Sequence, residues 1–268
     1  MKITKLFILI TFFSGVAFSQ VRTDITYDLS CLGSDFTSTS TSLFGDLENG
    51  MLDAFGESVS IEEEINLGKE FLIESAKEFT YIKSGEKLKN IEGVLDKLNK
   101  VILNPKGFSY KIFLVDSSII NAFTVGGNIF FTTGMYDFCL SKNEIACIIG
   151  HEIAHNELGH INDQIKRTKT ANSYLGENIG NITATIGNVL ATPFNQKDEA
   201  FCDLLGIDLA YAAGFEPCSN VELWKRMSLN EGGNSQFTSL FSTHPYSSKR
   251  SDCSKRHIET NYNIKCKE

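Results

Sequence analysis

The sequence lacks three features, and each absence argues against a class of protein. No dense run of Lys or Arg occurs and the net charge is −8, so we expect no nucleic-acid binding. The seven cysteines include no C-x-x-C pair, which argues against a zinc site made of thiolates and a thioredoxin-type active site. After the N-terminus, no apolar segment reaches the roughly 20 residues of a spanning helix, so we expect no membrane span in the mature chain.

The N-terminus has the pattern of a secretion signal. Two lysines precede an apolar run at 6–18, and the small residues Ala17 and Ser19 would suit a cut before Gln20. The run is about 13 residues long, too short for an uncleaved membrane anchor, which is the alternative. We therefore predict a signal peptide at 1–19 and an exported protein, located in the periplasm or secreted.

An exported chain can form disulfides, and an odd number of cysteines leaves at least one thiol free. Three cysteines lie in apolar segments of helical pattern and are expected to pack in the core: Cys139, Cys147 and Cys202. Any disulfide is expected among the other C-terminal cysteines: Cys218, Cys253 and Cys266.

Apolar spacing divides the mature chain into a weak start and one organised domain. Residues 20–60 show no clear period and are predicted to be a loosely packed lead-in, followed by a single domain at 61–268. Period-2 and β-rich patterns predict strands at 110–115 and, around Gly126 and Gly127, in two pieces at 121–134. Helical spacing predicts helices at 61–79, 88–102, 142–161, 173–191, 195–213, 221–229 and 247–258.

The helix at 142–161 contains the stretch HEIAH. His151 and His155 are four residues apart, about 40° around a helix axis, so both rings can reach one ion. Glu152 lies about 100° from His151, close enough to hold a water bound to that ion. His160 lies about 140° from His155 by the same count and is not expected to be a ligand.

This HExxH pattern is typical of zinc hydrolases. Two imidazoles and one carboxylate leave Zn²⁺ a position for water, whose pKa falls to about 7, and a neighbouring carboxylate can take its proton. The pattern predicts one zinc per chain and peptide hydrolysis, with Glu152 as the base. The alternative, two surface histidines on a helix, is disfavoured because the surrounding residues, such as Ile149 and Ile153, are apolar and would be buried.

The third ligand distinguishes the classes of zinc peptidase. A metzincin requires Gly and His at the positions of Leu158 and Ile161, so this class is excluded. A second helix offers Glu199 to the metal and, one turn later, Asp203 to orient a ligand histidine. Asp198 is the competing candidate for the metal carboxylate. It lies about 140° from Asp203 around the helix axis, which makes it a worse fit than Glu199. The alternative for this stretch is a solvated acidic helix start.

Three successive blocks resemble a known family: INAFTVGGNIFFTTGMYDFCLSKNEIACIIGHEIAHNELGH, DEAFCDLLGIDLAYAAGFEP and FSTHPYSSKR. They are similar to the HtpX-like and CAAX prenyl protease zinc peptidases, peptidase family M48, over residues 61–258. The family pattern ExxAD implies that Glu199 is the third zinc ligand, with its Asp at Asp203. Cys202 stands where the family has Ala.

The resemblance also implies a fold and the roles of two further residues. The fold would be α+β and mainly helical, a gluzincin-type zincin with a small sheet over the HExxH helix. Its edge strand, which we assign to GGNIFF at 126–131, would bind an extended peptide. His244 could approach the zinc and aid catalysis or block it, and Arg250 could hold the catalytic loop or stabilise an oxyanion. The alternative for His244 and for Arg250 is an ordinary surface residue. The segment 172–193 is predicted to be either a lid or a close-packed core helix.

The function implied is a stand-alone exported zinc metalloendopeptidase acting on unfolded or extended polypeptides, in protein quality control of the cell envelope. The alternative is a zinc-holding, chaperone-like module that binds extended peptides at the sheet edge without cleavage. Glu152 argues against that alternative because a binder has no use for a base. A structural zinc site is disfavoured because such sites close all four positions and use Cys. The sequence leaves the substrate and the oligomeric state open.

Overall fold

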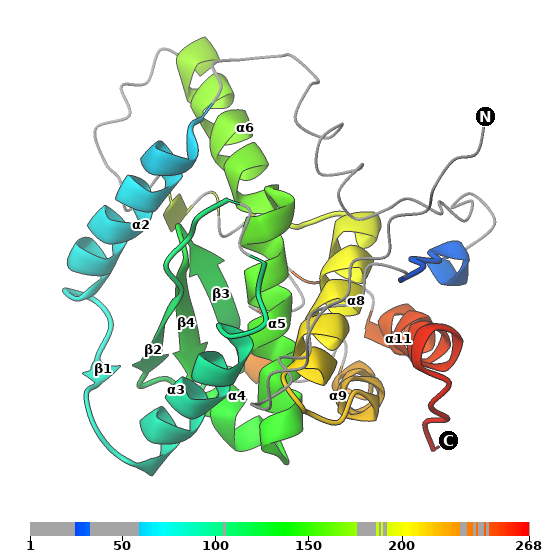
Figure 1. Cartoon of the computed structure of the whole chain (residues 1–268). Coiled ribbons are helices and arrows are strands. Elements are labelled where there is room, and N and C mark those ends of the chain that lie inside the picture. The colour runs from blue at the N-terminus through cyan, green and yellow to red at the C-terminus, as the bar shows by residue number, and fades with distance from the viewer. Residues whose placement is uncertain are drawn as a thin grey trace, which may run out of the picture.

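The computed structural model describes residues 25–32, 59–103, 106–175, 186–187, 189, 192–230, 235–237, 240, 244 and 247–267. The predicted signal peptide, most of the predicted lead-in and much of the segment 172–193 lie outside these residues. The described part is mainly helical, with one small sheet lying between helices (Figure 1). The fold is therefore α+β, as predicted.

The sheet has four strands in the order β1-β2-β4-β3. They are β1 Tyr81–Ile82, β2 Lys111–Val115, β3 Ala122–Val125 and β4 Asn128–Thr132. Strand β2 is parallel to β4, and β3 and β4 form an antiparallel hairpin.

The assignment of GGNIFF as the edge strand is wrong. Its residues 128–131 belong to β4, which lies between β2 and β3 and is buried along its whole length. Gly126 and Gly127 have φ values of 58° and 82° and make the turn that folds β4 back along β3. The edge nearest the HExxH helix is therefore β3.

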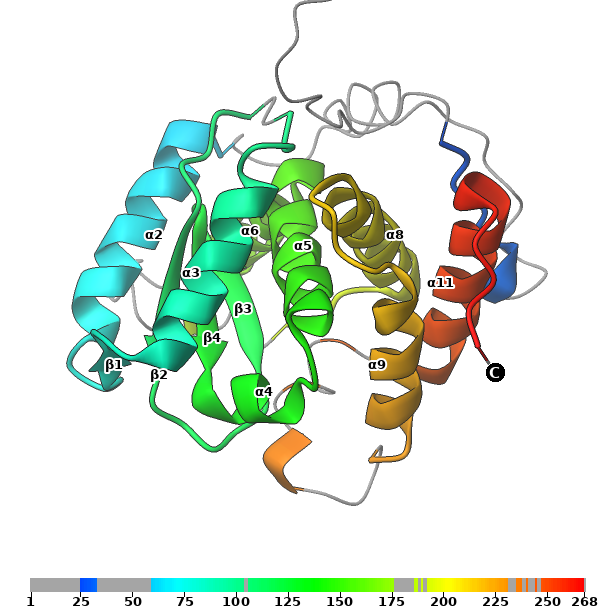
Figure 2. The same ribbon diagram turned by 60° about the horizontal axis from the view of Figure 1, so that its bottom comes forward.

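The two faces of the sheet pack against different helices. Ile112, Leu114 and Ile129 face α3 Glu86–Leu98 and α5 Lys142–Leu158 in the main core. The opposite face carries a row of register partners, Phe113, Phe130 and Phe123, whose rings stack. Helix α2 Ile61–Ser75 covers this row, and Figure 2 shows the sheet between α2 and α5.

Helix α5 is shorter than predicted. It begins after Ser141, whose side chain accepts a hydrogen bond from the Glu144 amide, and it ends at Gly159 with φ 83°. A new helix, α6 His160–Leu175, starts directly afterwards. The predicted helix through 161 is therefore two helices, and 162–172, for which no helix was predicted, belongs to the second.

Helix α5 packs closely on α8 Gln196–Ala212 because two glycines face each other. A Cβ at Gly150 would lie 2.8 Å from the Gly206 carbonyl oxygen, and a Cβ at Gly206 would lie 2.8 Å from the His151 amide nitrogen. Neither position has room for a side chain. This close approach, one residue before His151, brings the acidic residues of α8 to the HExxH helix.

Helix α11 Ser247–Tyr262 packs on α8, and α9 Cys218–Ser228 packs on α11 and α5, with the short α4 Thr133–Phe138 beside the sheet. Two disulfides occur here: Cys218–Cys266 joins α9 to the chain after α11, and Cys31–Cys253 joins the segment 25–32 to α11. The first lies within the predicted set, whereas Cys31 was not expected to pair. Of the three free cysteines predicted in the core, two are buried and Cys139 is half-buried.

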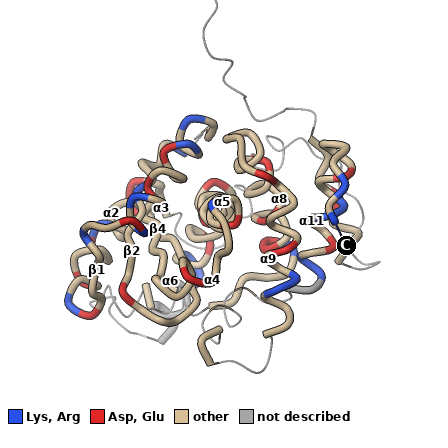
Figure 3. Tube along the Cα trace, turned by 90° about the horizontal axis from the view of Figure 1, so that it is seen from below, with Lys and Arg blue, Asp and Glu red and all other residues tan. Residues whose placement is uncertain are grey.

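Residues 25–32 pack against α8 and α11. Tyr27 donates a 2.6 Å hydrogen bond to Asp208, and Leu29 and Leu32 are buried. Along α3, acidic and basic residues are interspersed (Figure 3). Among the described residues, no helix combines the length and the apolar character needed to cross a bilayer.

Candidate active site

The structure brings together four side chains that could hold one metal ion. His151 and His155 come from α5, Glu199 from α8, and His244 from the chain before α11. Their ligand atoms all lie within 4.8 Å of one another, and all four residues are buried.

The two histidines of α5 face each other as their spacing predicts. The Nε2 atoms of His151 and His155 are 3.0 Å apart. Glu199 lies against both: its Oε1 is 3.3 Å from Nε2 of His155, and its Oε2 is 3.6 Å from Nε2 of His151. Two imidazoles and one carboxylate, all buried, are a donor set that suits a zinc ion.

His151 is held from behind by a charged network. Its Nδ1 lies 2.9 Å from Oδ1 of Asp203, the partner predicted by helix spacing. Arg250 donates to both oxygens of Asp203, at 2.6 and 2.7 Å, and its Nη1 is 2.7 Å from Oε2 of Glu199. The guanidinium stacks on Trp224, with its carbon 3.5 Å from the ring centroid. Arg250 therefore lies behind the candidate ligands, where it can hold them, and is not a surface residue.

Burial and neighbouring charges shift the pKa values of the two carboxyls in opposite directions. Burial alone would raise the pKa of Glu199, but His244 and Arg250 hold the pKa of this carboxyl well below its usual range. Burial raises the pKa of Glu152, although His244 and His151 oppose the shift. Burial lowers the pKa of His155 well below its usual value, which keeps its ring neutral. A neutral imidazole and an ionised carboxylate are the forms that bind a metal.

His160 lies against the site, although its angle around a continuous helix predicted that it would point elsewhere. Its Nδ1 lies 3.1 Å from Nδ1 of His155, because the helix ends at Gly159 and the count does not continue through it. The thiol of Cys202 is 3.3 Å from the same nitrogen, and Asp198 faces the other side of the ring at 3.7 Å.

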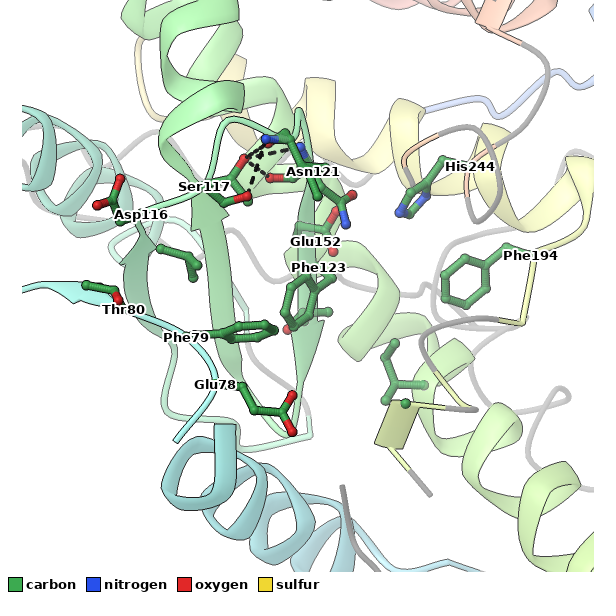
Figure 4. Close-up of a pocket in the computed structure, with 16 residues that line it drawn as sticks. Glu78, Phe79, Thr80, Asp116, Ser117, Asn121, Phe123, Glu152, Phe194 and His244 are labelled. Atoms are coloured by element: carbon green, nitrogen blue, oxygen red, sulfur yellow. Dashed lines mark hydrogen bonds between the residues drawn. The ribbon is translucent and has the colours of Figure 1, made fainter. Parts of the chain in front are cut away.

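A cavity of about 540 Å³ opens beside these residues (Figure 4). Glu152 and His244 line it at the side of the candidate metal group, and Phe79, Phe123 and Phe194 line its apolar part. Phe123 lies on β3, so the outer strand of the sheet, among the strands that the structure describes, forms one wall. Glu152 is thus placed between the candidate metal group and a space that can hold a side chain.

Sequence reasoning missed two aromatic residues that shape the site. Trp224 supports Arg250, and the ring of Phe194 stacks on His155 with centroids 4.0 Å apart. Trp224 is the only tryptophan of the chain, which is a weak signal of a special role. Phe194 gave no signal, because it belongs to no periodic pattern.

A small sheet packed on an HExxH helix, with a His/Glu donor group between two helices, defines the fold as an α+β zincin. Residues 87–253 match the sequence profile of peptidase family M48, and the chain belongs to this family.

The curated relatives include two kinds of metalloprotease. The mitochondrial metalloendopeptidase OMA1 of Schizosaccharomyces pombe is 28% identical over 169 residues, 58% of this chain and 50% of the relative. The metalloprotease LoiP of Escherichia coli is 26% identical over 160 residues, 55% of this chain and 62% of the relative. Human mitochondrial OMA1 is 26% identical over 176 residues, 56% of this chain and 33% of the relative. The matches thus span only part of each relative's length.

Proposed function

We propose that the protein is a zinc-dependent metalloendopeptidase in which His151, His155 and Glu199 hold the metal. The observation that carries this proposal is the convergence of these three donors, within 4.8 Å, beside a cavity lined by Glu152. Membership of a peptidase family and the names of the relatives support the reaction class. Zinc is preferred because two imidazoles and a carboxylate leave it a free position for water.

When bound, zinc would lower the pKa of a water molecule and polarise the peptide carbonyl. Glu152 takes the proton of that water and returns it to the leaving amine. Its pKa, raised by burial, makes it a stronger base than an exposed carboxylate. Asp203 fixes the ring of His151, and Arg250 neutralises the buried carboxylates behind it.

The substrate would be an unfolded or extended polypeptide. The edge of β3 carries backbone groups that can pair with an added strand, and the cavity beside it can accept an apolar side chain among its aromatic rings. We propose export to the periplasm, with envelope proteins as substrates. Two disulfides support an oxidising compartment.

Glu152→Gln tests the mechanism, because the amide keeps the shape but cannot take a proton. We expect unchanged zinc content and a fall of at least about 100-fold in kcat/KM on a quenched peptide. Glu92→Gln, on the exposed side of α3, is the matched control. Cleavage by Glu152→Gln at the wild-type rate would contradict the mechanism. Zinc-loaded wild-type protein that binds peptides without cutting any would favour the chaperone-like alternative.

His244 is proposed to close the metal's open position when no substrate is present. Its Nδ1 is 2.9 Å from Oε1 of Glu199, so it already belongs to the donor group. His244→Ala should then raise basal cleavage at constant zinc content. A fall in kcat would instead assign His244 to stabilisation of the transition state.

A further inference from the structure

A second cluster of metal-binding side chains lies beside the proposed catalytic group, and the proposed reaction does not need it. Its members are His155, His160 and Cys202, whose ligand atoms lie within 4.8 Å of one another. Nδ1 of His160 is at the centre, 3.1 Å from Nδ1 of His155 and 3.3 Å from Sγ of Cys202. Spacings of this size also separate the ligand atoms around one tetrahedral ion.

The thiol is the unusual member. The family pattern resembled by this chain has Ala at position 202, so hydrolysis does not require a thiol there. Cys202 is fully buried, and its thiol is in contact with an imidazole. Cys147 is just as buried and belongs to the same core cluster as Cys202, but within the described residues it is not part of a group of metal-binding side chains. The two thiols therefore share burial and differ in their neighbours.

The ring of His160 is oriented for a ligand role. Asp198 lies 3.7 Å from its Nε2, so a proton on Nε2 would face a carboxylate and leave Nδ1 as the free electron-pair donor. Asp198 and Cys202 are one turn apart on α8, so both face α6. The His160 and Asp198 side chains are 13% and 28% exposed, which gives an ion a route from solvent.

We propose that Cys202, His160 and Nδ1 of His155 form a second metal site that binds a thiophilic ion such as Zn²⁺, Cd²⁺ or Cu⁺. A thiolate with imidazoles is a soft donor set suited to these ions. On binding, the ion displaces the thiol proton and the Nδ1 proton of His155 into solvent.

The position of His155 couples this site to the proposed catalytic one. Its Nε2 belongs to the first donor group and its Nδ1 to the second, so two ions would share a single ring. An ion at Nδ1 draws electron density from the ring and takes His160 away from its contact with His155. Filling the second site should therefore inhibit cleavage.

Titration of the metal-free protein with Cd²⁺ tests the proposal without relying on activity. Wild-type protein should develop a sulfur-to-cadmium charge-transfer absorption, and it should bind one equivalent more than Cys202→Ala in equilibrium dialysis. Cys202→Ala restores the residue of the family pattern and is expected to fold, and Cys202→Ser is a second variant without the thiolate. Both should lack the absorption.

Two further variants complete the design. Cys147→Ala, the matched buried thiol, should keep the absorption and the full stoichiometry. His151→Ala should bind one equivalent of Cd²⁺ less than wild type and keep the thiolate absorption. The first site is thus measured separately from the second. Absence of the band in wild-type protein, or its survival in both Cys202 variants, would overturn the proposal and leave the proposed hydrolase function untouched.

Discussion

The two histidines of the HExxH motif are supported in opposite ways. Behind His151 stand Asp203 and Arg250, a fully charged and buried pair. Behind His155 stand the imidazole of His160 and the ring of Phe194, which carry no fixed charge. One side of the site is therefore held by ions in a fixed arrangement, and the other by neutral contacts.

The difference predicts unequal sensitivity to mutation. Removing one member of a buried ion network leaves its partner charged and unpaired, which costs far more than the loss of a neutral contact. The His151 side should thus govern whether the site forms at all. The His155 side should tolerate change.

The largest effect is expected from Arg250→Met, which removes the cation but keeps an apolar side chain on Trp224. Asp203 and Glu199 would both lose a buried partner, and the free energy of unfolding should fall by about 3–5 kcal/mol. Urea denaturation measures this. Arg256→Met is the control, because the Arg256 and Asp28 side chains are 48% and 33% exposed and the loss should stay below about 1 kcal/mol. Equal losses in the two variants would contradict the comparison.

The buried carboxyl of Glu64 has a raised pKa, whereas the pKa of Glu199 beside Arg250 is lowered. The two carboxyls should therefore affect stability with pH in opposite directions. Burial raises the pKa of Glu64 to about 7, although Asn162 donates to it and Lys106 is near. Between the usual carboxyl pKa and this value the folded state holds a proton that the unfolded state releases. Stability should therefore fall as pH rises towards 7, by up to about 3 kcal/mol, and level off above.

Glu64→Gln should remove this slope and be more stable than wild type at pH 8. Urea denaturation at pH 5 and pH 8 measures both effects. Glu157, whose pKa is also raised by burial, adds a background slope to both proteins. A slope that is identical in wild type and Glu64→Gln would show that Glu64 is ionised throughout.

Asp203→Asn tests the support of His151 with nearly the same shape. Because the amide cannot balance Arg250 or polarise the ring as a carboxylate does, zinc affinity should fall by about 10- to 100-fold. Competition with a chelator of known affinity measures the loss. Asp252→Asn, on the exposed side of α11, provides the control. An affinity within about twofold of wild type would remove Asp203 from the support of the metal site.

The smallest effect is expected from His160→Asn on the neutral side. Losing one neutral hydrogen bond to His155 is worth about 1 kcal/mol, so zinc affinity should fall only about fivefold. The same chelator competition measures it beside Asp203→Asn. A loss larger than that of Asp203→Asn would reverse the comparison between the two sides.

Local periodicity predicted much of this arrangement. The spacing of four residues in His151/His155 and in Glu199/Asp203 fixed which side chains share a helix face. The preference for Glu199 over Asp198 followed from the same angles. These relations hold within one helix and need no knowledge of the fold.

Relations between elements were less accessible. The angular count that placed His160 on another face assumed one continuous helix. That helix ends at Gly159, so the count does not apply to His160. The assignment of GGNIFF to the edge failed because alternation of residues does not tell which side of a sheet a returning strand joins. Cys31 could not be paired with Cys253, because nothing local records a contact over a sequence separation of 222 residues.

The two disulfides also determine what happens if the chain is cut. Cys31–Cys253 closes one covalent loop, and Cys218–Cys266 closes a second that overlaps it. A single cut at any peptide bond between residues 31 and 266 therefore falls inside at least one loop, and the two pieces remain joined. If the protein cleaves its own chain, the nicked molecule keeps its mass on a non-reducing gel, and its fragments separate only after a reductant is added.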